Sequence, residues 1–176
     1  LDVSEATGPM AELAKLAAIL DCDLTPTDIR EVALHFEQNG NALGAVRVSG
    51  PFSAATMEGK LKVELSSIDR RVLNLAGAAS GIDFNSTVIS SANDVVISQK
   101  GNAISINGQL NANKLSLTKK AEKQTTPILD LVAAYELSVD QTAKSALIQK
   151  FNLDGMQNGK KILHSAVAKP MPDRKS

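Results

Sequence analysis

The stretch "KGNAISINGQLNA", Lys100–Ala112, decides the fold class of this chain. It opens with a tight polar turn, after which Ile104, Ile106 and Leu110 follow at even spacing, with small or polar residues between them. Even spacing places side chains on one face of a strand. No reactive group accompanies these residues. The stretch therefore predicts a sheet with one apolar face and no catalytic centre of its own.

Composition narrows the class of protein. The chain has 176 residues, which favours one domain, and 43% of them are hydrophobic. Aromatic residues make up only 3%, so the core must be aliphatic and few side chains can stack on bases. Nineteen basic residues balance nineteen acidic ones, so no net charge steers the chain to nucleic acid, and we expect no nucleic-acid partner.

The same alternation recurs along the chain. Asn39-Gly40 is a hairpin signal, and the turns "QKGN" and "QNGK" separate further strands. We predict strands at 83–90 and 94–99, a turn at Gly50-Pro51, and long strands at 128–139, 146–156 and 161–169. The pattern indicates an antiparallel meander of short hairpins.

Helical spacing appears in two places. Pro9–Leu20 has apolar residues on one helical face after an N-terminal proline, and Ile68–Ala79 has Ile68, Val72, Leu75 and Ala79 on one face. We therefore expect a mainly β chain with two short helices. Its parts are a helical segment over residues 1–27, the sheet over residues 28–171 with a helix near 68–79, and a tail over residues 172–176.

No chemical constellation is visible. His35 and His164 lie far apart in sequence and have no ligand partners at metal-site spacing. Cys22 is the single cysteine, which excludes an internal disulfide and a cysteine-based zinc site. We expect no catalytic residue, no metal and no cofactor, and we do not expect an enzyme.

The apolar alternation itself has two interpretations. It can be the ordinary core of a half-buried sheet that the helices seal. Alternatively, two short helices leave part of the face uncovered, and a large uncovered apolar face marks a binding site. The pattern alone does not choose between them.

Longer segments carry a family resemblance. The segment "GNAISINGQLNANKLSL" (101–117) and the closing "LDGMQNGKKILHSAVAKPM" (153–171) resemble segments of AsmA-like and TamB-like bacterial envelope proteins, and "GAVRVSGPFSAATMEGKLKVEL" (44–65) is compatible. The resemblance covers about residues 28–171. It implies a curved, taco- or groove-like sheet that is lined with apolar side chains.

The resemblance also implies a function. Such proteins are anchored in the inner membrane, cross the periplasm, and take part in phospholipid transport between the inner and outer membranes or in outer-membrane assembly. We expect this chain to be a periplasmic fragment with its anchor elsewhere, with phospholipid acyl chains as its ligands and outer-membrane assembly proteins as a second class of partner. The rival expectation is a non-catalytic structural or interaction domain of a large envelope or surface protein. The residues expected to line the groove are Val32, Leu34, Phe36, Leu61, Val63, Leu65, Ile104, Ile106, Leu110, Leu131, Tyr135 and Leu137.

Overall fold

The computed structural model describes residues 16–167 and 171–172. Its elements are β1 (Leu16–Thr25), β2 (Asp28–Gln38), β3 (Asn41–Ser53), β4 (Glu58–Asp69), α1 (Arg70–Ala78), β5 (Ile82–Asp83), β6 (Val88–Ser98), β7 (Ala103–Leu115), β8 (Thr118–Lys119), β9 (Gln124–Thr125), β10 (Leu129–Asp140), β11 (Ser145–Gln157), β12 (Lys160–Val167) and β13 (Met171–Pro172).

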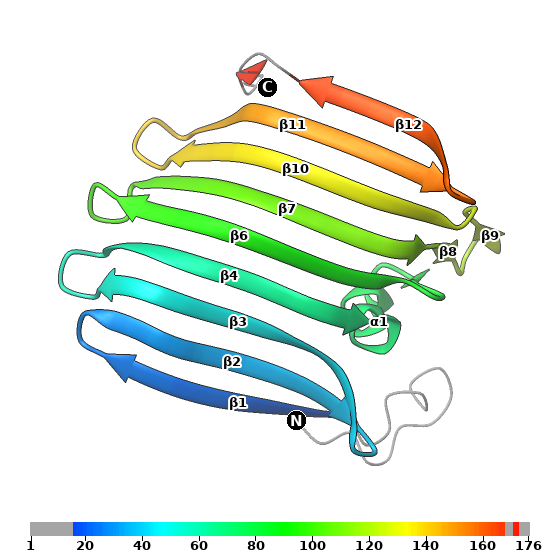
Figure 1. Cartoon of the computed structure of the whole chain (residues 1–176), viewed down its shortest axis with the longest axis horizontal. Helices are drawn as coiled ribbons and strands as arrows, with labels where there is room; N and C mark the ends of the chain where they lie inside the picture. The colour runs from blue at the N-terminus through cyan, green and yellow to red at the C-terminus, as the bar shows by residue number, and fades with distance from the viewer. Residues whose placement is uncertain (1–15, 168–170, 173–176) are drawn as a thin grey trace.

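One large sheet dominates the molecule (Figure 1). Its order β1-β2-β3-β4-β6-β7-β10-β11-β12 follows the chain, with every neighbouring pair antiparallel and the short β13 also pairing with β11. The short strands β5, β8 and β9 form a second, small sheet. The predicted antiparallel meander is confirmed. The large sheet is open and not strongly curled.

The two tight turns at Asn-Gly pairs form where the sequence predicts them. Asn39 and Gly40 have φ values of 52° and 75°, and Asn158 and Gly159 have φ values of 51° and 74°. Two successive positive φ values give the two-residue turn whose twist matches that of antiparallel strands. These turns set the register of the β2–β3 and β11–β12 hairpins.

The second predicted helix is present as α1. Asp69 caps its first turn by accepting a hydrogen bond from the Arg71 backbone N–H at 2.9 Å. The same carboxylate binds the Arg71 Nε at 2.7 Å, and the Arg71 guanidinium continues to the Gln38 Oε1 at 2.9 Å. The helix packs mainly on β5 and the end of β4. It lies at the right-hand end of the sheet in Figure 1 and not over its centre.

The first predicted helix is wrong over its last five residues. Leu16–Leu20 belong to β1 and pair with β2 from Gln38 to Leu34, while residues 9–15 lie outside the described part of the chain. The spacing that favoured a helix is overridden by the ladder with β2, because this neighbouring strand pairs with each of these five residues and supplies hydrogen-bond partners along one edge of β1. The described residues therefore contain one helix in place of the expected two.

The turn predicted at Gly50-Pro51 is also wrong. Both residues lie inside β3, and the chain turns at residues 54–57. Gly50 has a φ of 128°, and a Cβ there would lie 2.3 Å from the Lys60 carbonyl oxygen. The glycine therefore permits a close approach between β3 and β4 and does not reverse the chain.

The bounds predicted for the strands at 83–90 and 94–99 are wrong. A single strand, β6, runs from Val88 to Ser98, and only Ile82–Asp83 form the separate β5. The small polar residues around Asn93 do not interrupt the strand, because their backbone groups remain in the ladders with β4 and β7. Side-chain polarity alone does not end a strand that has a partner on each side.

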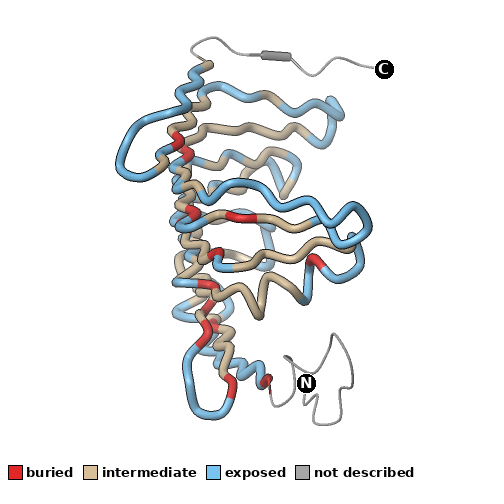
Figure 2. The backbone as a smooth tube through the Cα atoms, turned by 90° about the vertical axis from the view of Figure 1, so that its right-hand side faces the viewer, coloured by how far each residue is buried: buried red, intermediate tan, exposed pale blue. Residues whose placement is uncertain are grey.

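Few side chains are fully buried. Figure 2 shows the buried positions scattered along the stack of strands. Among the described residues, the larger buried apolar side chains are Leu16, Leu43 and Ile68, and the others are alanines. These three lie toward the end of the sheet that also carries α1, since β1 and β3 begin there and β4 ends there. The core is thus concentrated at one end, and most of the sheet is only half-buried.

Candidate apolar binding face

Register joins the separate alternations into one surface. Leu61 of β4 pairs with Val95 of β6, which pairs with Ile106 of β7, then with Leu137 of β10 and Ile148 of β11. Directly paired residues of antiparallel strands point to the same face. We call these five residues the central apolar row. It crosses four strand spacings, a length of about 19 Å.

Two further rows run parallel to the central one and reach β1. One passes from Cys22 through Val32, Val48 and Val63 to Phe151, and the other passes from Leu20 through Leu34 and Leu65 to Leu153. Together the three rows define what we call the apolar face. The members of the outer two rows that the prediction missed include Leu20, Cys22, Val46, Val48, Phe151 and Leu153.

The twelve predicted lining residues all fall on the apolar face, by register and by two-residue spacing from the rows. All twelve are half-buried, and none is sealed from solvent. In the described part of the chain, α1 contacts mainly β5 and β4 and leaves the central apolar row uncovered. The structure brings these residues together as one surface.

The prediction also missed Val95 and Ile148 of the central apolar row. Val95 has Ile97 two residues further on in "DVVIS", so a signal was present there, whereas Ile148 directly follows Leu147 in "SALIQK". Ile148 pairs with Leu137 beside a bulge at Gln149, which shifts the alternation of β11 by one residue. Such a shift hides a face from a pattern read along one strand.

A polar group is built into the middle of the apolar face. The Tyr135 hydroxyl donates a hydrogen bond to the Asn93 Oδ1 at 2.5 Å, and the Asn93 amide donates to the Val63 carbonyl at 3.2 Å. Gly108 lies between Asn93 and Tyr135 in the register. Burial raises the pKa of Tyr135, so its hydroxyl remains a donor at neutral pH. The pair thus satisfies the Asn93 side chain, which would otherwise interrupt the apolar face.

The opposite face is charged. The residues that alternate with the central apolar row include Lys62, Asp94, Asn107, Glu136 and Lys150, paired across the sheet in that order. The Lys150 Nζ lies 3.4 Å from the Glu136 Oε1. We call this surface the polar face. Both faces of the sheet are therefore accessible to solvent over its centre, and they differ sharply in chemistry.

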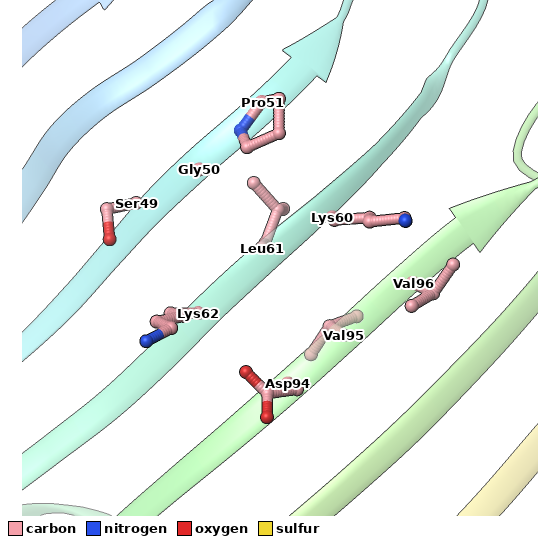
Figure 3. Close-up of a pocket in the computed structure, with 9 residues that line it drawn as sticks. All are labelled: Ser49, Gly50, Pro51, Lys60, Leu61, Lys62, Asp94, Val95 and Val96. Carbon is pink, nitrogen blue, oxygen red and sulfur yellow. The ribbon is translucent and has the colours of Figure 1, made fainter.

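A cavity of about 330 Å³ lies between β3, β4 and β6 (Figure 3). Leu61 and Val95 of the central apolar row line it, and so do Lys60, Lys62 and Asp94. This volume is at the lower end of the range for small-molecule sites, about 300–1,000 Å³. The lining residues do not form a catalytic group. The cavity is a local hollow in the sheet beside Gly50.

The candidate reactive side chains are dispersed. His35 lies 3.7 Å from Asp21, and His164 lies 2.7 Å from Asp154, on opposite halves of the sheet. Hydrogen bonds from Lys161 and His164 hold the pKa of Asp154 below its ordinary value. Cys22 is exposed and unpaired. Among the residues that the structure describes, no group of three His, Cys, Asp or Glu side chains is placed to hold a metal ion.

Within the described ranges, the single helix α1 is neither long enough nor apolar enough to span a bilayer. Comparison of the chain with protein-family models, with curated proteins and with solved structures finds no match. The fold and the apolar face are therefore the observations on which a function can be argued.

Proposed function

We propose that this chain is a periplasmic section of an AsmA/TamB-like envelope protein, in which the apolar face shields lipid acyl chains. The observation that carries the proposal is the central apolar row with its two flanking rows, which run across the strands and whose apolar side chains are mostly half-buried or exposed. In the longer protein, this sheet forms part of the wall of a taco-like groove. That protein is anchored in the inner membrane and moves phospholipid between the two membranes or supports outer-membrane assembly.

The chemistry of the face suits an acyl chain. Burying a methylene group contributes about 0.8 kcal/mol, so a chain lying along the central apolar row gains several kcal/mol without a polar contact. Valine, leucine and isoleucine offer contacts of similar strength at each strand. Such repeated and unspecific contacts let a lipid slide from one position to the next, which a conduit requires.

The charged polar face also supports the proposal that only the apolar face contacts lipid. Lys62, Glu136 and Lys150 alternate with the apolar rows and keep the far side of the sheet in water. A sheet with this division presents one side to acyl chains and the other to solvent. A domain serving only as a scaffold would be expected to bury the apolar face under its own chain.

The test compares neighbouring residues on opposite faces. A photo-crosslinking amino acid is placed at Ile106, on the apolar face, or at Asn107, on the polar face, and the protein is illuminated in the presence of phosphatidylethanolamine and phosphatidylglycerol vesicles. We expect lipid adducts by mass spectrometry at position 106 and several-fold fewer at 107. A second pair, Val63 and Glu64, repeats the comparison on β4.

Lipid adducts that are absent at 106 and 63, with crosslinks only to the chain's own residues, would contradict the proposal. That result would favour a structural or interaction domain whose apolar face is covered by protein. Equal labelling at 106 and 107 would also contradict it, because adsorption to vesicles without use of the apolar face predicts that outcome.

A further inference from the structure

Two long connections between strands meet at one end of the large sheet. Residues 70–87 link β4 to β6, and residues 116–128 link β7 to β10. They supply α1 and the small sheet of β5, β8 and β9, which lie at the right-hand end of the sheet in Figure 1. Residues 118–125 of the second connection form an antiparallel hairpin of β8 and β9, which we call the lysine hairpin.

The lysine hairpin concentrates positive charge. It contains Lys119, Lys120 and Lys123 and a single acidic residue, Glu122, which gives a net charge of +2 in a chain whose net charge is zero. Lys119 pairs with Glu122, Lys120 lies 4.0 Å from Asp83, and Lys123 makes no ion pair with another described residue. The side chains of Lys119 and Lys120 are 58% and 53% exposed. Exposed ion pairs contribute little, so these lysines can exchange their partners for an external anion.

The rest of the small sheet holds the lysine hairpin in place. The Thr118 and Thr125 hydroxyl oxygens lie 2.8 Å apart across the hairpin, and the Asn85 side-chain amide donates a hydrogen bond to the Thr118 hydroxyl at 3.0 Å. The Lys120 backbone N–H donates to the Gly81 carbonyl at 2.9 Å. A segment that is ordered before binding loses less conformational entropy when it binds. The three lysines are therefore presented together on an ordered support.

An exposed apolar side chain stands at the base of the same connection. Ile128, one residue before β10, is 57% exposed. Cations beside an exposed apolar group suit the surface of a bilayer, where lysines contact phosphate and the apolar group enters the boundary with the acyl chains. A free phosphate ion or an acidic peptide in water would use the lysines and leave Ile128 without a role.

We propose that the lysine hairpin docks this end of the sheet on the surface of a bilayer that contains anionic phospholipid. Lys119, Lys120 and Lys123 contact headgroup phosphates, and Ile128 enters the boundary beneath them. The docking surface is separate from the apolar face and needs no acyl chain bound there. It rests on the proposed function only in the expectation that the chain works beside a membrane.

Co-sedimentation with vesicles tests the docking. We expect the protein to bind phosphatidylethanolamine vesicles that contain phosphatidylglycerol, to bind vesicles without it much more weakly, and to dissociate as salt is raised. Replacing Lys119, Lys120 and Lys123 together by glutamine should weaken binding about a hundredfold. Ile128→Ser should weaken it as well and leave its salt dependence unchanged.

The matched control removes the same charge elsewhere. Lys60, Lys100 and Lys144 are exposed, and the last two lie in the turns at the opposite end of the sheet. Replacing these three by glutamine should retain vesicle binding, and circular dichroism checks that both triple variants fold. Equal losses in the two triple variants would overturn the proposal, because they would show an effect of net charge alone. Binding to soluble polyglutamate without binding to vesicles would also overturn it and assign the hairpin to an acidic polypeptide.

A second comparison separates docking from acyl-chain binding. Ile106→Asn with Leu137→Asn changes the central apolar row and should leave docking on anionic vesicles intact. The lysine triple variant should in turn keep the rise in thermal midpoint that a short-chain phosphatidylcholine, added below its micelle concentration, gives by binding the apolar face. Loss of docking in the Ile106 and Leu137 variant would show adsorption through the apolar face and would refute the hairpin as the docking surface.

Discussion

Gly108 is the residue on which the centre of the apolar face depends. A Cβ at this position would lie 2.1 Å from the Asn93 Oδ1 and 2.8 Å from the Tyr135 ring. The absent side chain lets the Tyr135 ring cross β7 and reach Asn93 on β6. The glycine therefore acts through packing between its two neighbouring strands and not through a positive φ.

We expect Gly108→Ala to destabilise the protein by about 1–3 kcal/mol, because the added methyl group displaces the ring and its hydrogen bond. Tyr135→Phe should cost about 0.5–1.5 kcal/mol through loss of that bond alone. Urea denaturation measures both effects. Because both changes break the same contact, the double variant should lose less than the sum of the single losses. Strict additivity would mean that Gly108 does not support the Tyr135–Asn93 bond.

At the scale of elements, α1 depends on its cap. Asp69 accepts hydrogen bonds from the Arg71 backbone and guanidinium, and that guanidinium ties the helix to Gln38 of β2. Burial raises the pKa of Asp69, but the hydrogen bonds and positive charge of Arg71 outweigh it, so the pKa lies below its ordinary value of 3.8. A carboxyl pKa that is lower in the folded state than in the unfolded state stabilises the fold at pH values above the unfolded-state pKa. This stabilisation is lost as the pH falls through the folded-state pKa.

Asp69→Ala should therefore destabilise the protein by about 1 kcal/mol at pH 7, the usual cost of a lost helix cap. The difference from the unmodified protein should narrow below about pH 4, where Asp69 becomes protonated. Thermal unfolding at pH 7, 5 and 3 measures this. Asp69→Asn keeps an oxygen acceptor without the charge, so it should lose less at pH 7. An unchanged difference down to pH 3 would show that the Asp69 charge plays no part.

At the scale of the whole molecule, the sheet has an accessible apolar face and a small core. The larger buried apolar side chains of the described chain, such as Leu43 and Ile68, lie toward one end, and the central apolar row is half-buried over four of its residues and exposed at Ile148. Any ligand that covers this row in the folded state and not in the unfolded chain must stabilise the fold by mass action. Stability is therefore a direct readout of lipid binding.

We expect a short-chain phosphatidylcholine, used below its micelle concentration, to raise the thermal midpoint. At a hundred times its dissociation constant the gain is about 2.7 kcal/mol. The paired variant Ile106→Asn with Leu137→Asn should reduce this shift, because both residues lie in the central apolar row. Ser105→Asn with Ser138→Asn, the adjacent pair on the polar face, should retain it. Glycerophosphocholine, which lacks acyl chains, should give no shift with any variant.

The local features of this fold were accessible from the sequence. The hairpins at Asn39-Gly40 and Asn158-Gly159 depend on residues that accept positive φ, and the twelve lining residues depend on two-residue alternation. Both are properties of neighbours along the chain. The apolar–polar alternation is harder to recognise where a polar residue on the apolar face depends on a partner far along the chain. Asn93 is acceptable on the apolar face only because Tyr135, 42 residues later, binds it.

By itself, the sequence determined that the chain forms an antiparallel meander, and it determined which side chains of most strands share a face. The tertiary structure decided that the segment at Leu16–Leu20 is a strand, that α1 stands at the end of the sheet, and that the rows stay in register across the strands. The reason is physical. Alternation and turn preference act between adjacent residues, whereas register and coverage depend on contacts between segments that are distant along the chain.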